Sequence, residues 1–205
     1  MNKKGLSGLA VTGIVLGALA LLVIIFLSIF IGSYNSLVTL EETVDAKWAN
    51  VESAYQRRAD LVPNLVATVQ ESADFQQETQ TQIAAVRSQA VTAQQAMNDA
   101  QSPEEFQAAS QQVEAAVGAF RGLNINVERY PNLDISTFNT LQDQLEGTEN
   151  RVKTERDIYN EAVRQYNIKT RRFPSNIIAG MFGFEQKDLF EAQEGADEVP
   201  DVNFN

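Results

Sequence analysis

The chain opens with a long apolar run and continues with a polar stretch in which apolar residues recur at helical spacing. From Gly5 to Gly32 the sequence contains no charged residue. As a helix that rises ~1.5 Å per residue, this run would extend roughly 40 Å, which is more than the ~30 Å hydrocarbon core of a bilayer. The pattern therefore predicts a single transmembrane anchor within residues 1–32.

A cleaved signal peptide is the alternative interpretation of the run, because Ala18-Leu19-Ala20 resembles a cleavage site. Cleavage there would leave the apolar stretch from Leu21 to Phe26 at the new N-terminus, where water would surround it. The length of the run favours an anchor that is kept.

The charges on either side of the run predict its orientation. Lys3 and Lys4 precede it, whereas Glu41, Glu42 and Asp45 are the first charged residues after it. Because positively charged flanks stay in the cytoplasm, we expect a cytoplasmic N-terminus and an extracytoplasmic remainder.

Two long amphipathic helices are predicted beyond the anchor, one near each end of the polar stretch. In both, apolar residues follow alternating steps of three and four, which places them on one helical face. Pro63 is predicted to kink or locally unwind the first, because proline lacks a backbone donor and clashes one turn back. The two stripes are Leu37, Leu40, Val44, Trp48, Val51, Tyr55, Arg58, Val62, Leu65 and Val69, then Phe138, Leu141, Leu145, Thr148, Val152, Tyr159, Val163 and Tyr166.

Two shorter helices are predicted between the long ones, over about residues 74–100 and 103–122. Ser102-Pro103-Glu104-Glu105 is a typical helix start, with Ser as the N-cap and Glu105 completing a capping box. Residues 123–134 read as a long ordered loop. The sequence thus predicts an all-α protein in which residues 33–172 form an antiparallel four-helix bundle with long, partly coiled-coil helices.

The composition changes twice after the bundle. Residues 173–190 form an apolar segment that is too short to span a membrane. Residues 191–205 contain acidic residues and no basic one, which predicts a disordered tail.

The amino-acid composition excludes several kinds of chemistry. The sequence has no His and no Cys, so zinc sites of the Cys/His kind and His-dependent triads are impossible. No phosphate-binding glycine loop or calcium loop is present. We therefore expect no catalytic residue, no metal and no cofactor. A net charge of −11 argues against nucleic acid as a partner, and an acidic body also repels anionic lipid headgroups.

Arg58 and Glu149 are the candidate polar pair inside the bundle. Arg58 falls on the apolar stripe of the first long helix, and Glu149 lies beside Thr148 on the last. In antiparallel helices the two could meet and fix the register, or both could extend to solvent. Asp60, Asn64, Asn150 and Asn167 could likewise form a polar layer, or Asp60 and Asn64 could satisfy the backbone groups that Pro63 frees.

Two further groups of residues are candidates for contacts outside the bundle. Gly13 and Gly17 fit the small-xxx-small pattern that lets membrane helices pack closely. The end of the last long helix and the apolar segment could contact the membrane interface, a partner or their own bundle. The residues of this second group are Lys169, Arg171, Arg172, Ile177, Ile178, Met181, Phe182 and Phe184.

Several short motifs resemble those of the LemA family of bacterial membrane proteins, in the same order along the chain. They are Ser33-Tyr34-Asn35-Ser36-Leu37-Val38, Arg57-Arg58-Ala59-Asp60-Leu61-Val62-Pro63-Asn64-Leu65, Tyr130-Pro131-Asn132-Leu133, Gly147-Thr148-Glu149-Asn150, Tyr159-Asn160, Tyr166-Asn167 and Phe173-Pro174.

The resemblance implies a single-pass protein of the bacterial cell membrane with an extracytoplasmic helical bundle. Relatives are often encoded near a membrane-bound heat-shock metalloprotease, and one branch takes part in forming magnetosome membranes. We therefore expect a self-assembling scaffold or membrane organiser in the cell envelope, whose partners are the lipid bilayer and further copies of itself. The alternative is an adaptor that holds another membrane protein, such as that protease.

Overall fold

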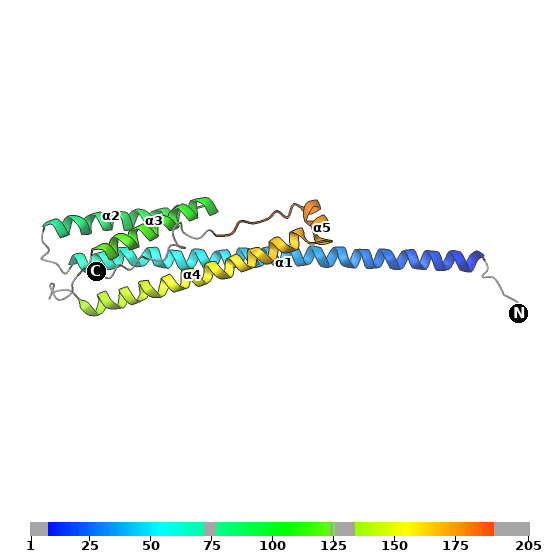
Figure 1. Cartoon of the computed structure of the whole chain (residues 1–205), viewed down its shortest axis with the longest axis horizontal. Coiled ribbons are helices and arrows are strands. Elements are labelled where there is room, and N and C mark those ends of the chain that lie inside the picture. The colour runs from blue at the N-terminus through cyan, green and yellow to red at the C-terminus, as the bar shows by residue number, and fades with distance from the viewer. Residues whose placement is uncertain (1–7, 72–76, 124, 126–133, 191–205) are drawn as a thin grey trace, which may run out of the picture. The chain divides into compact units, whose positions relative to one another are not determined.

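The computed structural model describes residues 8–71, 77–123, 125 and 134–190. Most of the predicted loop over residues 123–134 lies outside these ranges, as does the whole predicted tail over residues 191–205. The described residues form five helices and no strand (Figure 1). The prediction of an all-α protein is therefore confirmed. The helices are α1 (Gly8–Glu71), α2 (Gln77–Asp99), α3 (Pro103–Gly122), α4 (Ile135–Arg171) and α5 (Ser175–Phe182).

The chain divides into two compact units, and α1 and α4 each contribute to both. The bundle unit consists of residues 46–159, and the anchor unit consists of residues 1–45 together with 160–205. The predicted boundaries at residues 32, 172 and 190 stay predictions.

The bundle unit is held together by the predicted apolar stripes. Residues of α1, α2, α3 and α4 that follow helical spacing are buried in its core, among them Tyr55, Ile83, Val113 and Leu145. Helix α2 packs against α3 (Figure 1). This unit therefore has the four-helix arrangement that the spacing predicts.

Helices α1 and α4 run antiparallel in the bundle unit, and two contacts define their register. The rings of Trp48 and Tyr159 lie 5.2 Å apart between centroids. Ten residues further along α1 and ten residues earlier on α4, Arg58 lies 3.8 Å from Glu149. Equal steps in opposite directions are the expected geometry of two straight, antiparallel helices in contact.

Pro63 lies inside α1, and the helix continues on both sides of it. Of the two effects predicted for this proline, local unwinding does not occur. Val62 and Leu65, the stripe residues on either side of Pro63, are both buried, so tertiary packing offsets the hydrogen bond that proline removes.

The helix starts follow local rules. At α3 the Ser102 hydroxyl accepts the Glu105 N–H at 3.2 Å, as predicted, while the Glu105 carboxylate accepts the N–H of Gln101 at 2.8 Å. At α4, Asp134 accepts hydrogen bonds from the backbone and hydroxyl of Thr137, which hold the pKa of Asp134 below its ordinary value. Because of this cap, α4 begins at Ile135, one turn before its first stripe residue.

In the anchor unit, α1 is the one helix of the described residues that is long and apolar enough to cross a membrane. Its most apolar 18-residue window has a mean hydropathy of 3.2, and none of that window is buried. Large side chains from Ile14 to Ile31 are exposed accordingly. No other described part of the chain buries this apolar stretch, as is expected of a segment that spans a membrane.

Candidate functional site

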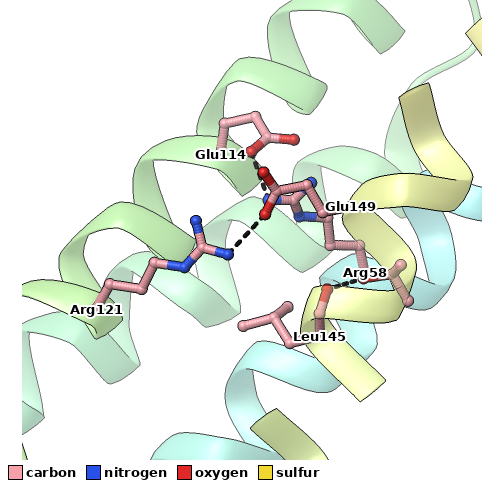
Figure 2. Close-up of polar contacts among 6 residues, drawn as sticks. Arg58, Glu114, Arg121, Leu145 and Glu149 are labelled. Atoms are coloured by element: carbon pink, nitrogen blue, oxygen red, sulfur yellow. Dashed lines mark hydrogen bonds and ion pairs between the residues drawn. The ribbon is translucent and has the colours of Figure 1, made fainter. Parts of the chain in front are cut away.

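The best-defined polar site of the bundle unit is an ion cluster that joins three helices (Figure 2). The Arg58 Nη2 atom of α1 lies 2.9 Å from Glu114 Oε2 of α3 and 3.8 Å from Glu149 Oε2 of α4. Arg121 of α3 completes the cluster at 2.6 Å from Glu149 Oε2. The Arg58 side chain is only 4% exposed and Glu114 is 21% exposed, whereas Glu149 and Arg121 are about half exposed.

The two carboxylates of the cluster differ in their affinity for protons. Burial raises the pKa of Glu114, and the nearby Arg58 opposes that rise only in part. The hydrogen bond from Arg121 lowers the pKa of Glu149. Arg58 is therefore the main compensation for a partly buried acid, and Glu149 is a half-exposed carboxylate that is paired with Arg121.

Sequence reasoning had paired Arg58 with Glu149 and had not found Glu114 or Arg121. The structure brings the predicted pair together, but the shorter contact of Arg58 is with Glu114. A signal was present, because Glu114 and Arg121 are seven residues apart and so lie on one face of α3 beside the apolar stripe. The role of this cluster in setting the register stays a prediction.

The polar layer considered for Asp60, Asn64, Asn150 and Asn167 stays a prediction, and the structure gives other partners for two of these residues. Asp60 accepts a hydrogen bond from Gln94 Nε2 of α2 at 2.8 Å. Asn167 instead binds the segment that follows α5.

Two asparagines of α4 hold the backbone of residues 184–190, and we call this arrangement the asparagine clamp. The Asn167 side chain donates to the Lys187 carbonyl at 2.8 Å and accepts the Lys187 N–H at 3.0 Å. Asn160 makes the same pair with Phe190, at 3.1 and 2.8 Å. Seven residues of helix rise about 10.5 Å and three residues of extended chain span about 10 Å, so the two pairs are in step.

The clamped segment also binds α1 in the anchor unit. Lys187 Nζ lies 2.6 Å from Asp45 Oδ1 and 3.8 Å from Glu41 Oε1. It also lies 5.9 Å from the ring centroid of Tyr166. Burial and these two carboxylates raise the pKa of Tyr166 to about 12, so its hydroxyl stays neutral. The segment thus connects α1 to α4.

Replacing Asn167 by Ala is expected to free the Lys187 amide to exchange with solvent. Two hydrogen bonds are lost at about 1 kcal/mol each, which predicts exchange that is faster by about 30-fold. Hydrogen exchange followed by mass spectrometry would measure this at residues 185–190. Asn150, exposed on the same helix, provides the control N150A. Equal exchange in N167A and N150A would show that the clamp contributes nothing.

Helix α5 packs one face against α1 within the anchor unit. Ile178 and Ala179 are buried against Leu37, and Phe30, Tyr34 and Phe184 surround this small core. Gly183 ends α5 with a left-handed conformation (φ 76°), and the Phe184 N–H then donates to the Ala179 carbonyl at 3.0 Å.

The other face of α5 is uncovered in the described structure. Ile177 is 54% exposed and Met181 is 66% exposed. Phe182 is half exposed, and its ring lies 4.9 Å from Tyr34 and 5.9 Å from Phe30 between centroids. Of the predicted contact residues, Ile178 and Phe184 therefore face the chain itself, whereas Ile177 and Met181 face outward.

The predicted basic residues lie at the end of α4, beside the anchor. Lys169 and Arg172 line a groove of about 460 Å³ whose other walls include Ile29, Gly32 and Phe173. Arg171 is exposed nearby in sequence. Gly13 and Gly17 are also open, since a Cβ atom added to either would meet nothing within 4 Å.

Comparison with known proteins gives one family. The LemA family matches residues 47–204. Magnetosome protein MamQ 2 of Paramagnetospirillum magneticum is 26% identical over 192 residues, which cover 85% of this chain and 71% of the relative. MamQ 1 of the same organism has the same values. Magnetosome protein MamQ of Magnetospirillum gryphiswaldense is 24% identical over 189 residues, or 84% and 70% of the two chains.

Proposed function

Because the chain belongs to the LemA family, we propose that it is a non-enzymatic, membrane-anchored scaffold that assembles with itself in the bacterial cell envelope. Its membrane association is indicated by the apolar N-terminal helix and by relatives named as magnetosome proteins. We propose the orientation given by Lys3 and Lys4, with the helical units outside the cytoplasm.

One observation carries the proposal, namely the apolar surface that the fold leaves uncovered. In the anchor unit this surface includes the span from Ile14 to Ile31 and the outer face of α5, and the contact of Phe30 with Phe182 joins them. Uncovered apolar surface of this extent is typical of membrane or protein contacts. The ion cluster and the asparagine clamp, in contrast, hold helices and backbone of the chain itself.

The scaffold should form a large homomer through its anchor. Leu at both Gly13 and Gly17 would block close helix approach, so we expect the particles to fall to monomers or dimers. Mass photometry of the full-length protein in mild detergent, beside a form lacking residues 1–32, would measure this. The control Ala18→Leu places one such side chain about 120° away on the helix, so it tests whether the effect depends on the glycine face.

The results would separate the scaffold from the adaptor. A homogeneous homomer that both G13L/G17L and the truncation dissociate would support the scaffold. A full-length protein that is already a monomer and brings another membrane protein with it would overturn the scaffold in favour of the adaptor.

A further inference from the structure

The groove beside the anchor combines two chemically different walls. Ser28, Ile29 and Gly32 come from the last turns of the apolar run of α1. Lys169 and Arg172 come from the end of α4, and Phe173 follows them. The Ser28 hydroxyl donates to the Ile24 carbonyl of its own helix at 2.8 Å, so the wall that α1 contributes remains apolar.

The position of the groove relative to a bilayer follows from the anchor. If the apolar run spans the membrane, Ile29 lies near the end of the hydrocarbon core and the first residues beyond Gly32 lie among the headgroups. Tyr34 and Phe182 pack together at this level, where aromatic side chains are enriched in membrane proteins. The groove therefore crosses the boundary between acyl chains and headgroups.

The two cations of the groove, Lys169 and Arg172, and the neighbouring Arg171 lack acidic partners. Within the described ranges no carboxylate lies within 4.0 Å of Lys169, Arg171 or Arg172, whereas Arg58, Arg121 and Lys187 all have ion pairs. Unpaired cations at headgroup level attract anionic lipid.

We infer that this groove binds one anionic phospholipid. The phosphate lies between Lys169 and Arg172, and an acyl chain follows Ile29 and Phe173 toward the hydrocarbon core. Phe173 is 75% exposed and so is free to contact lipid. The inference rests on the membrane anchoring in the proposed function and is independent of self-assembly.

Native mass spectrometry of the full-length protein would test the site. The probe is an equimolar mixture of dioleoylphosphatidylglycerol and dioleoylphosphatidylcholine, which share acyl chains and differ in net charge. We expect adducts of the anionic lipid to dominate, and the double variant Lys169→Gln with Arg172→Gln to lower its affinity about 5-fold for each cation removed. Phe173→Ser should weaken binding of both lipids.

The matched control is Arg151→Gln with Lys153→Gln, which removes two exposed cations from the same helix. Equal loss in both double variants, or no preference for the anionic lipid in the unchanged protein, would overturn the inference. So would displacement of the lipid by excess inorganic phosphate, since that result would assign the groove to free anions. The same spectra give the mass of the protein particle as well as its lipid adducts. The proposed self-assembly and the proposed lipid site are therefore tested separately.

Discussion

Replacement of Arg58 by Met should lower the free energy of unfolding of the bundle unit by about 3 kcal/mol at neutral pH. Met keeps most of the apolar stem and removes the charge, so Glu114 remains in a largely buried place with no cation 2.9 Å away. Removing one partner of a buried ion pair costs about 3–5 kcal/mol, mostly because the other charge is left uncompensated.

Urea unfolding would measure the loss. Trp48 is the only tryptophan, and its ring packs against Phe106 and Tyr159 in the bundle unit, so its fluorescence reports on this core. The control Arg57→Met removes an exposed neighbouring charge and should change stability by less than about 0.5 kcal/mol. Unchanged assembly with raised stability in R58M would show that the cluster does not set the register.

The loss of free energy of unfolding in R58M should also depend on pH. Burial already places the pKa of Glu114 above its ordinary value of 4.5, so the folded state binds this proton more tightly than the unfolded state. Stability contributed by this group therefore falls as pH rises from that value through the folded pKa. Without Arg58 the folded pKa rises further, so the loss in R58M should be larger at pH 8 than at pH 5.

A second substitution isolates the titrating group. In Arg58→Met with Glu114→Gln no acid remains at this position, so its deficit should be the same at pH 5 and pH 8. The comparison stays above pH 5, because the lowered pKa of Glu149 makes that residue lose its stabilising charge at lower pH. If the loss of free energy of unfolding in R58M does not change with pH, it comes from altered packing and not from the charge on Glu114.

Replacing Ile178 by Ala should release α5 from α1, whereas the same change at Ile177 should not. The two residues are adjacent and chemically identical, but Ile178 is 3% exposed and Ile177 is 54% exposed. Removing three buried carbon atoms costs about 2–4 kcal/mol, because a cavity remains beside Leu37. The exposed residue should cost less than about 0.5 kcal/mol.

Hydrogen exchange of the full-length protein in detergent would measure the release. The Phe184 N–H, which donates to Ala179, should exchange faster in I178A by about 30-fold or more, since each 1.4 kcal/mol is a factor of ten. In I177A it should exchange as in the unchanged protein. Faster exchange in I177A would mean that the outer face of α5 is also covered, by another copy or by detergent.

The helices were predictable because their signal is periodic. An apolar stripe that repeats over many turns determines which face of a helix is buried. The contact of Arg58 with Glu149 could then be predicted by counting residues along two antiparallel helices. The cap at Ser102 was predictable because it involves neighbours in sequence.

The remaining features depend on how each helix is rotated about its axis and on contacts with backbone groups far away in the sequence. A periodic pattern of apolar residues carries no information about either. Glu114 contacts Arg58 only because α3 is turned to bring it there. Both Ile177 and Ile178 are apolar, and an eight-residue helix is too short for a pattern to tell its buried face from its exposed one. The asparagine clamp joins side chains to peptide groups 20 and 30 residues away, and peptide groups are the same in every sequence.

The asparagine clamp therefore constrains chain length more than residue identity. Because Asn160 and Asn167 bind only N–H and C=O groups, most side chains are acceptable at positions 187 and 190, although proline, which has no N–H, is not. An inserted or deleted residue between the two asparagines would turn one of them by about 100° around α4. The clamp by itself therefore fixes the number of residues between positions 187 and 190, whereas the side chain of Lys187 is constrained separately by its ion pairs with Asp45 and Glu41.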